Sequence, residues 1–490
     1  MLSILLSRAR SYEDEHLSAV SPLDLPCFHV TGGVGWINDP NGFSLYRGEY
    51  HLFFQYNPYS THWDTMHWGH VKTRDFIRWE RLPCALAPDK SYDKDGCFSG
   101  SAVELRDGRH LLMYTGVRKT DDGHEFQTQC IAFGDGINYE KYDGNPVIDS
   151  ELLPAGGSEV HFRDPKIWVD GDRFHAVAGN LTSDGSGAVL MFESDDALSW
   201  RFIGEVAASE NRFGRMWECP DLFRLDGKDV LIVSPQEVYT RDPEFIDGNT
   251  TLCLIGELDE NNRLIRETEH TIDCGLDFYA PQTVLTADGR RVMIAWMQYW
   301  NSVEIRPRED LSFYGQMTLP RELHVRDGRL IQSPVRELDD YRGDRTAFEG
   351  IPVSERTQLL GIGGRCLDLT VKIRPAKEEI FDSFSVHAAQ GGEYTTEICY
   401  SPSTNTILVD RTRSGWPENV LNRREFAVRD RGGEITLRLI LDRYSLEIFV
   451  NGGEQAASFV IFSPASADGI SFEARGEAVI DVEQYSLDIQ

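Results

Sequence analysis

Short apolar strands separated by turn residues dominate the first two thirds of the chain, and one such pattern occurs five times. In each copy, a turn with glycine and a polar residue leads into a run of apolar or alternating residues. The glycines stand at 48, 108, 171, 227 and 289, so the copies are 60, 63, 56 and 62 residues apart. Asp-Gly hairpins at similar spacing can also arise by chance, but all-β units of near-constant length predict a five-bladed β-propeller.

The pattern changes after residue 323. From about residue 350 the chain has roughly eight short strands, with strict alternation in "EITLRLILD" and "YSLEIFVNGG". Alternation of this kind predicts sheets with one buried face, and this number of strands predicts a β-sandwich. No cluster of candidate catalytic residues occurs there. We therefore expect an N-terminal helix or tail over 1–22, a propeller over 23–345 and a supporting sandwich over 346–490.

Composition and charge narrow the range of partners and locations. The net charge is −30, with 79 acidic and 49 basic residues, so we expect neither nucleic acid nor a membrane surface as a partner. No apolar run has the length of a membrane span, and "MLSILLSRAR" lacks the pattern of a signal peptide. The nine cysteines are scattered and contain no CxxC pair. We expect reduced thiols, no disulfide, no zinc site and a cytoplasmic protein.

Three short motifs place a carboxylate beside proline or an aromatic residue. They are "WINDPNG" with Asp39, "HFRDPKIW" with Asp164 and "MWECPDLF" with Glu218, and each acid lies 9, 7 and 9 residues, respectively, before the glycine of a repeated hairpin. Equivalent positions in radially arranged blades point toward a common axis, so we expect the three acids to converge on the central channel. We interpret Asn-Asp-Pro-Asn-Gly as a turn that holds Asp39 at the channel mouth.

Convergent carboxylates are the usual equipment for glycoside hydrolysis. One ionised carboxylate attacks the anomeric carbon and one protonated carboxyl group donates to the leaving oxygen, at a separation of about 5 Å in retaining enzymes. Structural interpretations also exist: Asp-Pro is commonly a turn, Arg163 can be an ion-pair partner of Asp164, and most tryptophans belong to cores. No motif indicates a nucleotide, a cofactor or a metal ion.

The motifs "WINDPNG", "FFQYNP", "FSGSA", "FRDP", "WECPD", "FYAPQ" and "GQMTLPREL", in this order, resemble glycoside hydrolase family 32, the invertases, fructan hydrolases and sucrose-6-phosphate hydrolases. They cover most of residues 36–323, and "DRYSLEIFVNGG" resembles a marker of the family's C-terminal sandwich. The resemblance implies a five-bladed propeller followed by a sandwich. It also implies a β-fructofuranosidase that hydrolyses terminal β-D-fructofuranosides with retention and without a cofactor. The wording of "WECPD" and "FYAPQ" is more similar to the intracellular bacterial branch.

The resemblance also assigns roles to single residues. Asp39 would be the nucleophile, Glu218 the acid/base, and Asp164 a transition-state stabiliser that holds the fructose hydroxyls. The fructose subsite and its wall would contain Asn38, Gln55, Trp63, Phe98, Ser99, Arg163, Tyr279 and Trp296. A small-molecule sugar is the expected partner. Sucrose 6-phosphate as substrate, fructosyl transfer, a catalytically silent fructan-binding propeller and, more remotely, an arabinan-type hydrolase remain alternatives. The sequence leaves linkage preference and the choice between monomer and homo-oligomer undetermined.

Overall fold

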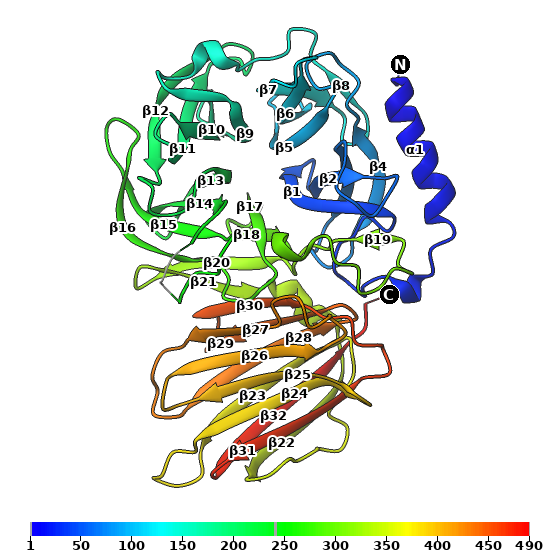
Figure 1. The fold of residues 1–490 in the computed structure, drawn as a ribbon, viewed down its shortest axis with the longest axis vertical. Coiled ribbons are helices and arrows are strands. Elements are labelled where there is room, and N and C mark those ends of the chain that lie inside the picture. Colours follow the sequence, from blue (N-terminus) through cyan, green and yellow to red (C-terminus); the bar gives the residue numbers. More distant parts are fainter. Residues whose placement is uncertain (1, 240–242, 490) are drawn as a thin grey trace.

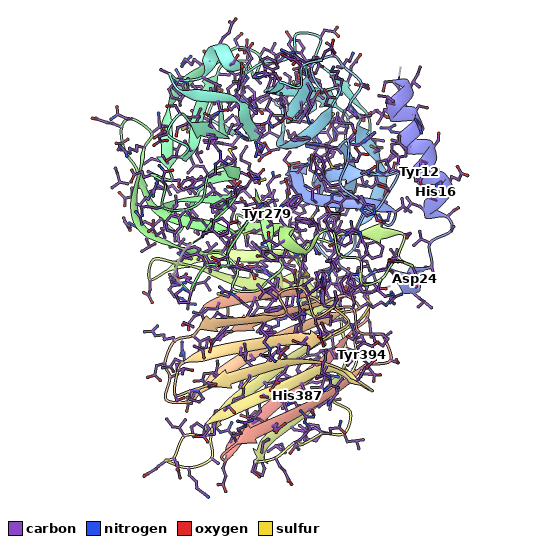
Figure 2. The ribbon with its side chains drawn as sticks, in the orientation of Figure 1. Tyr12, His16, Asp24, Tyr279, His387 and Tyr394 are labelled. Atoms are coloured by element: carbon purple, nitrogen blue, oxygen red, sulfur yellow. A yellow bond between two sulfur atoms is a disulfide. The ribbon has the colours of Figure 1, made fainter. Side chains whose placement is uncertain are left out.

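The computed structural model describes residues 2–239 and 243–489, which form one long helix and two bodies of β-sheet (Figure 1). The helix α1 (Ile4–Leu17) packs against β4 (Glu80–Leu86) at the outer edge of the first blade. Tyr12 and His16 stack on this helix with ring centroids 3.7 Å apart (Figure 2). The carboxylate of Glu13 accepts the backbone N–H of Cys84 at 2.9 Å, which ties the helix to the blade. No helix in the described ranges is both long and apolar enough to cross a membrane.

Five sheets arranged around a common centre form the larger body (Figure 1). Their strands are β1 (Gly35–Tyr46), β2 (Glu49–Asn57), β3 (His67–Thr73) and β4, then β5 (Gly96–Glu104), β6 (His110–Lys119), β7 (Glu125–Gly134) and β8 (Tyr139–Lys141), then β9 (Gly157–Asp170), β10 (Arg173–Thr182), β11 (Gly187–Ser194) and β12 (Trp200–Ala208), then β13 (Trp217–Leu225), β14 (Lys228–Pro235), β15 (Leu252–Leu258) and β16 (Leu264–Thr271), and finally β17 (Tyr279–Leu285), β18 (Arg291–Trp296), β20 (Arg321–Arg326) and β21 (Arg329–Pro334). The short strand β19 (Phe313–Tyr314) pairs in parallel with β1. The all-β, five-bladed prediction is confirmed.

The repeated hairpin of the sequence joins the first two strands of every blade. Its glycine has a positive φ in all five copies: Gly48 (79°), Gly108 (80°), Gly171 (58°), Gly227 (84°) and Gly289 (86°). A Cβ at any of these positions would meet no atom within 4 Å. Glycine is therefore favoured because the backbone is left-handed, a conformation that L side chains rarely adopt. Steric contact between a side chain and neighbouring atoms does not explain the preference.

The innermost strand of every blade has a β-bulge at the same level. The pairing register shifts at residues 37–40 of β1, 98–100 of β5, 163–166 of β9, 218–221 of β13 and 279–282 of β17. A bulge inserts an unpaired residue and redirects its side chain, so each inner strand is able to present a residue to the centre of the propeller.

The bulges correct one prediction. The stretch Asn-Asp-Pro-Asn-Gly is not a turn: it lies inside β1, which continues to pair with β2 beyond two register shifts. The turn interpretation was wrong because proline and glycine are favoured at bulges as well as at turns. Proline also follows the bulged residue in three other inner strands, at Pro165, Pro220 and Pro281.

The smaller body is a sandwich of one six-stranded and one five-stranded sheet. Its strands are β22 (Arg342–Val353), β23 (Leu367–Pro375), β24 (Ser383–Gly391), β25 (Tyr394–Ser401), β26 (Thr406–Arg413), β27 (Arg423–Ala427), β28 (Ile435–Asp442), β29 (Ser445–Val450), β30 (Gln455–Val460), β31 (Gly469–Arg475) and β32 (Ala478–Leu487). Short 3-10 turns lie at Pro22–Asp24, Ser150–Leu152, Trp300–Ser302 and Arg336–Tyr341. The division of the chain into domains at residues 22 and 345 stays a prediction.

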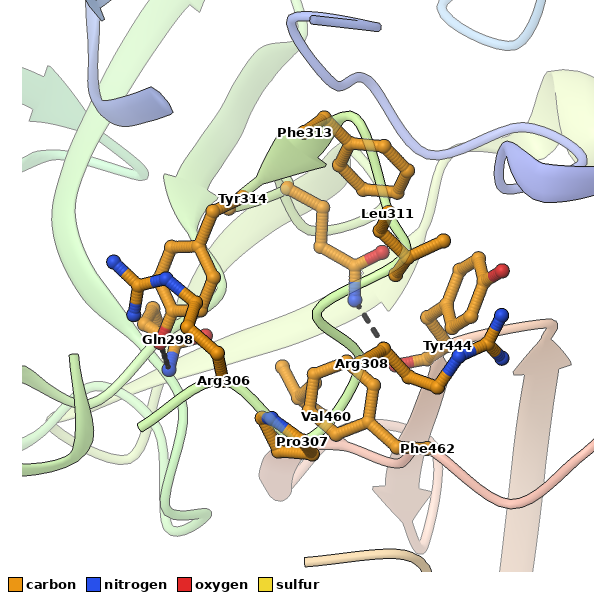
Figure 3. A pocket seen from close by; sticks show the side chains of 12 residues that line it. Gln298, Arg306, Pro307, Arg308, Leu311, Phe313, Tyr314, Tyr444, Val460 and Phe462 are labelled. Carbon is orange, nitrogen blue, oxygen red and sulfur yellow. Dashed lines mark hydrogen bonds between the residues drawn. The ribbon is translucent and has the colours of Figure 1, made fainter. Parts of the chain in front are cut away.

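A loop over residues 303–316 lies between the propeller and the sandwich and lines a small cavity of about 30 Å³ (Figure 3). The guanidinium of Arg306 lies 3.7 Å from the ring centroid of Tyr314 and 5.7 Å from that of Trp36. On the sandwich side, Gln316 Nε2 donates to the carbonyl of Tyr444 at 3.1 Å. The loop therefore joins the aromatic residues of β1 and β19 to the second body.

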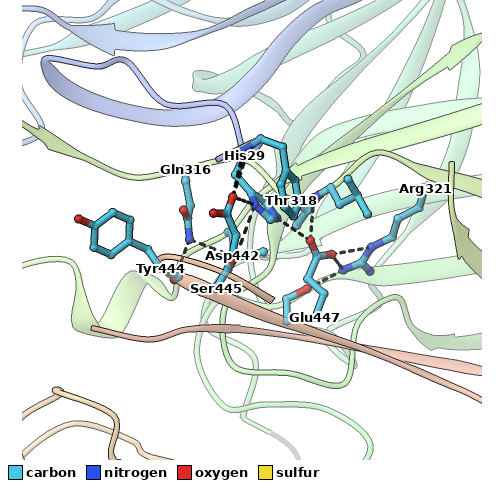
Figure 4. A network of polar contacts seen from close by, with 12 residues as sticks. His29, Gln316, Thr318, Arg321, Asp442, Tyr444, Ser445 and Glu447 are labelled. Atoms are coloured by element: carbon cyan, nitrogen blue, oxygen red, sulfur yellow. Dashed lines mark hydrogen bonds and ion pairs between the residues drawn. The ribbon is translucent and has the colours of Figure 1, made fainter. Parts of the chain in front are cut away.

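A buried ionic network joins the two bodies (Figure 4). His29 Nδ1 lies 2.8 Å from Asp442 Oδ2, and His29 Nε2 lies 2.9 Å from Glu447 Oε1. Arg321 continues the network, with Nη2 2.6 Å from Glu447 Oε2 and Nη1 2.9 Å from Asp273 Oδ2. All five side chains are fully buried, so each charge depends on its partners.

One disulfide also joins the propeller segment to the sandwich, which corrects the prediction that all cysteines are reduced. Cys27 and Cys366 are bonded at 2.07 Å and are 339 residues apart in the sequence. The spacing of the cysteines contained no signal for this pair, because only the fold brings the two positions together. The remaining seven cysteines are free thiols, and most of them are buried.

Candidate active site

The structure brings the three candidate carboxylates into one pocket of about 540 Å³ in the propeller. Asp39 comes from β1, Asp164 from β9 and Glu218 from β13, each at the bulge of its inner strand. Cys219 joins them: its Sγ lies 3.7 Å from Asp39 Oδ2 and 3.6 Å from Asp164 Oδ2. Three blades thus supply acids that are far apart in the sequence to a single cavity.

Asp39 has one oxygen held and one oxygen free. Ser99 Oγ donates to Asp39 Oδ2 at 2.8 Å, whereas Oδ1 has no hydrogen-bond partner among the described residues. Burial, followed by the negative charge of Glu218, raises the pKa of Asp39 to about 6. The carboxylate is therefore ionised at neutral pH, and its Oδ1 is a buried acceptor without a partner among the described residues.

Glu218 is held in one orientation by two neighbours. Arg163 Nε donates to Glu218 Oε1 at 2.9 Å, and Arg163 Nη2 lies 2.9 Å from the same oxygen. The hydroxyl of Tyr279, which lies near the centre of the propeller in Figure 2, donates to Glu218 Oε2 at 2.6 Å. Charge-assisted bonds of this kind fix the position of the carboxyl group.

Asp164 lies in a strained backbone conformation. Its φ is +64°, and its N–H donates to Thr115 Oγ1 at 2.9 Å. Asp164 Oδ2 accepts the backbone N–H of Cys219 at 3.0 Å. Burial and then the charge of Glu218 raise the pKa of Asp164 to about 7, although Arg163 lowers it. The proton affinity of Asp164 therefore depends on the charges of its neighbours.

Most of the remaining candidate residues line the same pocket: Asn38, Gln55, Trp63, Phe98, Ser99 and Arg163. Trp63 is 49% exposed and meets Phe98 edge-on with centroids 6.0 Å apart. It is therefore available to stack on a sugar face.

Two candidates stand behind the pocket wall and do not line it. Tyr279 contacts the pocket lining through Glu218, to which its hydroxyl donates, and through Trp300, which its ring meets edge-on. Trp296 is completely buried and packs against Trp300, with centroids 4.9 Å apart. Trp300, four residues further along, lines the pocket together with Trp63, and it was not predicted from the sequence. Trp296 and Trp300 occur in one aromatic stretch, and nothing local distinguishes the exposed ring from the buried one.

The sequence analysis also missed a group of polar residues on β6, β7 and β9. Lys119, Glu125, Gln127 and His161 also line the pocket. Gln127 is buried, and its Oε1 accepts from Arg163 Nη1 at 3.1 Å and from the N–H of Phe162 at 3.0 Å. These residues carry no motif: they come together because β7 pairs with β6 and contacts β9.

Two family models match nearly the whole chain. The glycosyl hydrolases family 32 N-terminal domain matches residues 29–334, and the glycosyl hydrolases family 32 C-terminal model matches residues 337–488. Among curated relatives, a sucrose-6-phosphate hydrolase of Zymomonas mobilis is 34% identical over 478 residues, covering 93% of this chain and 90% of the relative. A raffinose invertase of Escherichia coli is also 34% identical, over 462 residues and 93% of both chains.

Solved structures of family 32 enzymes are also similar to this chain. A mutant of the Bombyx mori family 32 β-fructofuranosidase in complex with sucrose superposes with a TM-score of 0.84 at 32% identity, over 99% of both chains. A sucrose-6-phosphate hydrolase from Lactobacillus gasseri superposes with a TM-score of 0.85 at 25% identity, over 98% of this chain and 96% of that one. The chain therefore belongs to glycosyl hydrolase family 32.

Proposed function

We propose that the protein is a retaining β-fructofuranosidase that releases fructose from the non-reducing end of sucrose and short fructo-oligosaccharides. One observation carries the proposal: Asp39, with an unpartnered Oδ1, shares a sugar-sized pocket with Glu218, which Arg163 and Tyr279 hold in place. Pockets of this volume accommodate small organic ligands. The similarity to a raffinose invertase, to sucrose-6-phosphate hydrolases and to a β-fructofuranosidase in complex with sucrose supports the same substrate class.

In the first step, the carboxylate of Asp39 attacks the anomeric carbon of the fructosyl unit. Glu218 donates its proton to the glycosidic oxygen, the bond between that oxygen and the anomeric carbon breaks, and the leaving sugar departs as an alcohol. The product is a fructosyl ester of Asp39. Arg163 and Tyr279 then stabilise the carboxylate left on Glu218 through the bonds described above.

In the second step, the carboxylate of Glu218 takes a proton from water, and the water oxygen bonds to the anomeric carbon. The ester bond to Asp39 breaks, which releases fructose and restores both carboxyl groups to their starting states. Two inversions at one carbon give overall retention. We assign to Asp164 the role of accepting hydrogen bonds from fructose hydroxyls, because its carboxylate lines the same pocket and contacts Cys219, the neighbour of Glu218.

Two substitutions test these roles. Asp39→Asn and Glu218→Gln preserve shape but remove the nucleophile and the acid/base, so each is expected to reduce kcat for sucrose by at least about 1,000-fold. Asp107→Asn, on an exposed hairpin remote from the pocket, serves as the matched control. Circular dichroism and thermal unfolding establish that the variants fold. Substantial release of fructose by folded Asp39→Asn protein contradicts the proposal, and kestose-type products at high sucrose identify fructosyl transfer in place of hydrolysis.

A further inference from the structure

The outer part of the pocket is dominated by acidic side chains. Besides the three catalytic-site acids, Asp64, Asp95 and Glu125 line it. Lys119 and Arg163 are the only lysine or arginine residues in the described part of the lining. The entrance of the pocket is therefore negatively charged, in a protein whose net charge is already −30.

The two basic residues are already engaged. Arg163 is held on Glu218 at 2.9 Å, and Lys119 Nζ lies 3.2 Å from Glu125 Oε2. The backbone N–H of Lys119 donates to Asp95 Oδ2 at 2.6 Å, which places a second carboxylate beside the same residue. His161 adds no positive charge at neutral pH, because burial and then Arg163 lower its pKa, and its Nδ1 faces Arg163 Nη1 at 3.4 Å.

We propose that this rim selects substrates with an uncharged leaving group and that Glu125 is the residue that discriminates against a phosphorylated sugar. The inference rests on the proposed function, since it concerns the leaving group of the same reaction. A phosphate dianion that approaches the rim meets Glu125 and Asp95, and Lys119, the exposed lysine of the described lining, is neutralised by its ion pair with Glu125. A neutral glucosyl unit instead offers hydroxyl donors to these carboxylates.

Glu125 is well placed to be tested without disturbing the pocket. Its Oε1 accepts from Gln127 Nε2 at 2.8 Å, and Gln127 in turn holds Arg163. Glutamine at position 125 retains a carbonyl oxygen for the bond from Gln127 and loses only the negative charge. Lys119 would then be released from its ion pair and become available to an incoming phosphate.

The experiment compares kcat/KM for sucrose and for sucrose 6-phosphate. The unmodified protein is expected to prefer sucrose by at least about tenfold, and Glu125→Gln to lower that preference by about fivefold, mainly through KM for the phosphorylated sugar. Lys119→Gln removes the cation and is expected to raise the preference for sucrose. Glu477→Gln is the control, because it breaks a Lys377–Glu477 pair of 2.5 Å on the sandwich and changes the net charge equally.

Each result has a distinct meaning. Preference of the unmodified protein for sucrose 6-phosphate overturns the inference and leaves the proposed hydrolysis intact. An equal change of the preference in Glu125→Gln and Glu477→Gln, or no change in either, overturns the role of Glu125. Release of fructose from neither sugar overturns the proposed function. In that case, calorimetric binding of the two sugars to the same proteins measures the discrimination directly, and tighter binding of the phosphorylated sugar overturns the inference.

Discussion

Replacement of His29 by glutamine removes the cation at the centre of the network between propeller and sandwich. The imidazole contacts Asp442 at 2.8 Å and Glu447 at 2.9 Å, and all three side chains are fully buried. Glu447 keeps Arg321 as a partner, whereas Asp442 keeps backbone N–H donors, including those of Cys27 and Phe28. The variant therefore leaves a buried carboxylate without its counter-charge, which is a costly arrangement.

Two independent arguments give the expected loss in the free energy of unfolding of His29→Gln. Although burial lowers it, the hydrogen bonds to Asp442 and then Glu447 raise the pKa of His29 from 6.5 to about 9. This difference corresponds to roughly 3 kcal/mol in favour of the folded state, and removing one partner of a buried ion pair costs about 3–5 kcal/mol. Because the folded-state pKa is the higher one, this stabilisation is fully present below pH 6.5 and is lost as the pH rises through about 9.

Urea unfolding, followed by tryptophan fluorescence, measures this contribution. The free energy of unfolding of His29→Gln is expected to lie about 3 kcal/mol below that of the unmodified protein near pH 6. The gap is expected to narrow markedly near pH 9.5, where the proton has left. His324→Gln is the matched control: its imidazole lies 3.4 Å from Asp226, is 62% exposed, and should contribute less than about 0.5 kcal/mol. A gap for His29→Gln that is under about 1 kcal/mol, or equal at both pH values, refutes the reasoning.

Two further predictions concern pH. Activity on sucrose is expected to fall as the pH decreases through about 6, because the raised pKa of Asp39 leaves the nucleophile protonated below that value; a kcat/KM profile that is flat down to about pH 4 contradicts this assignment. The free energy of unfolding is expected to decrease as the pH is lowered from about 6.5. Burial holds the pKa of His70 and of His110 well below its usual value. The unfolded chain therefore binds protons at these residues that the folded chain does not bind. Thermal midpoints measured at about pH 5 and pH 7 check this, and His70→Asn should reduce the difference, whereas an unchanged difference argues against the role of this residue.

Local chemistry specifies some parts of this fold and leaves others ambiguous. The hairpin glycines were recognisable because a positive φ is needed wherever two strands connect so tightly. The segment around Asp39 and Pro40 was misinterpreted as a turn because a bulge requires the same residue types. Only the continued pairing of β1 with β2 on both sides distinguishes the two, and that pairing depends on residues outside the motif.

The candidate site was predictable where a residue has an unusual neighbour. Asp39, Asp164 and Glu218 each precede a proline closely in an apolar stretch, and the structure brings all three together. Gln127 and Glu125 have no such neighbour in the sequence. They lie on β7, which carries no motif, and they reach the pocket because β7 packs against β9. Their role arises from tertiary contacts, which the pattern of one chain does not encode locally.

The two ends of the inner strands differ in how well they should tolerate inserted sequence. In β1, β5 and β13 the bulge lies near the N-terminal end of the strand, beside the pocket, and the glycine hairpin lies at the opposite end of the strand, with open space around it. The catalytic geometry is set by strand pairing within the sheets, so the hairpins are free to carry added sequence. A peptide tag or a fused domain inserted at Gly108 or Gly171 would lie on the face remote from the substrate. The protein is therefore suited to immobilisation or fusion through these hairpins.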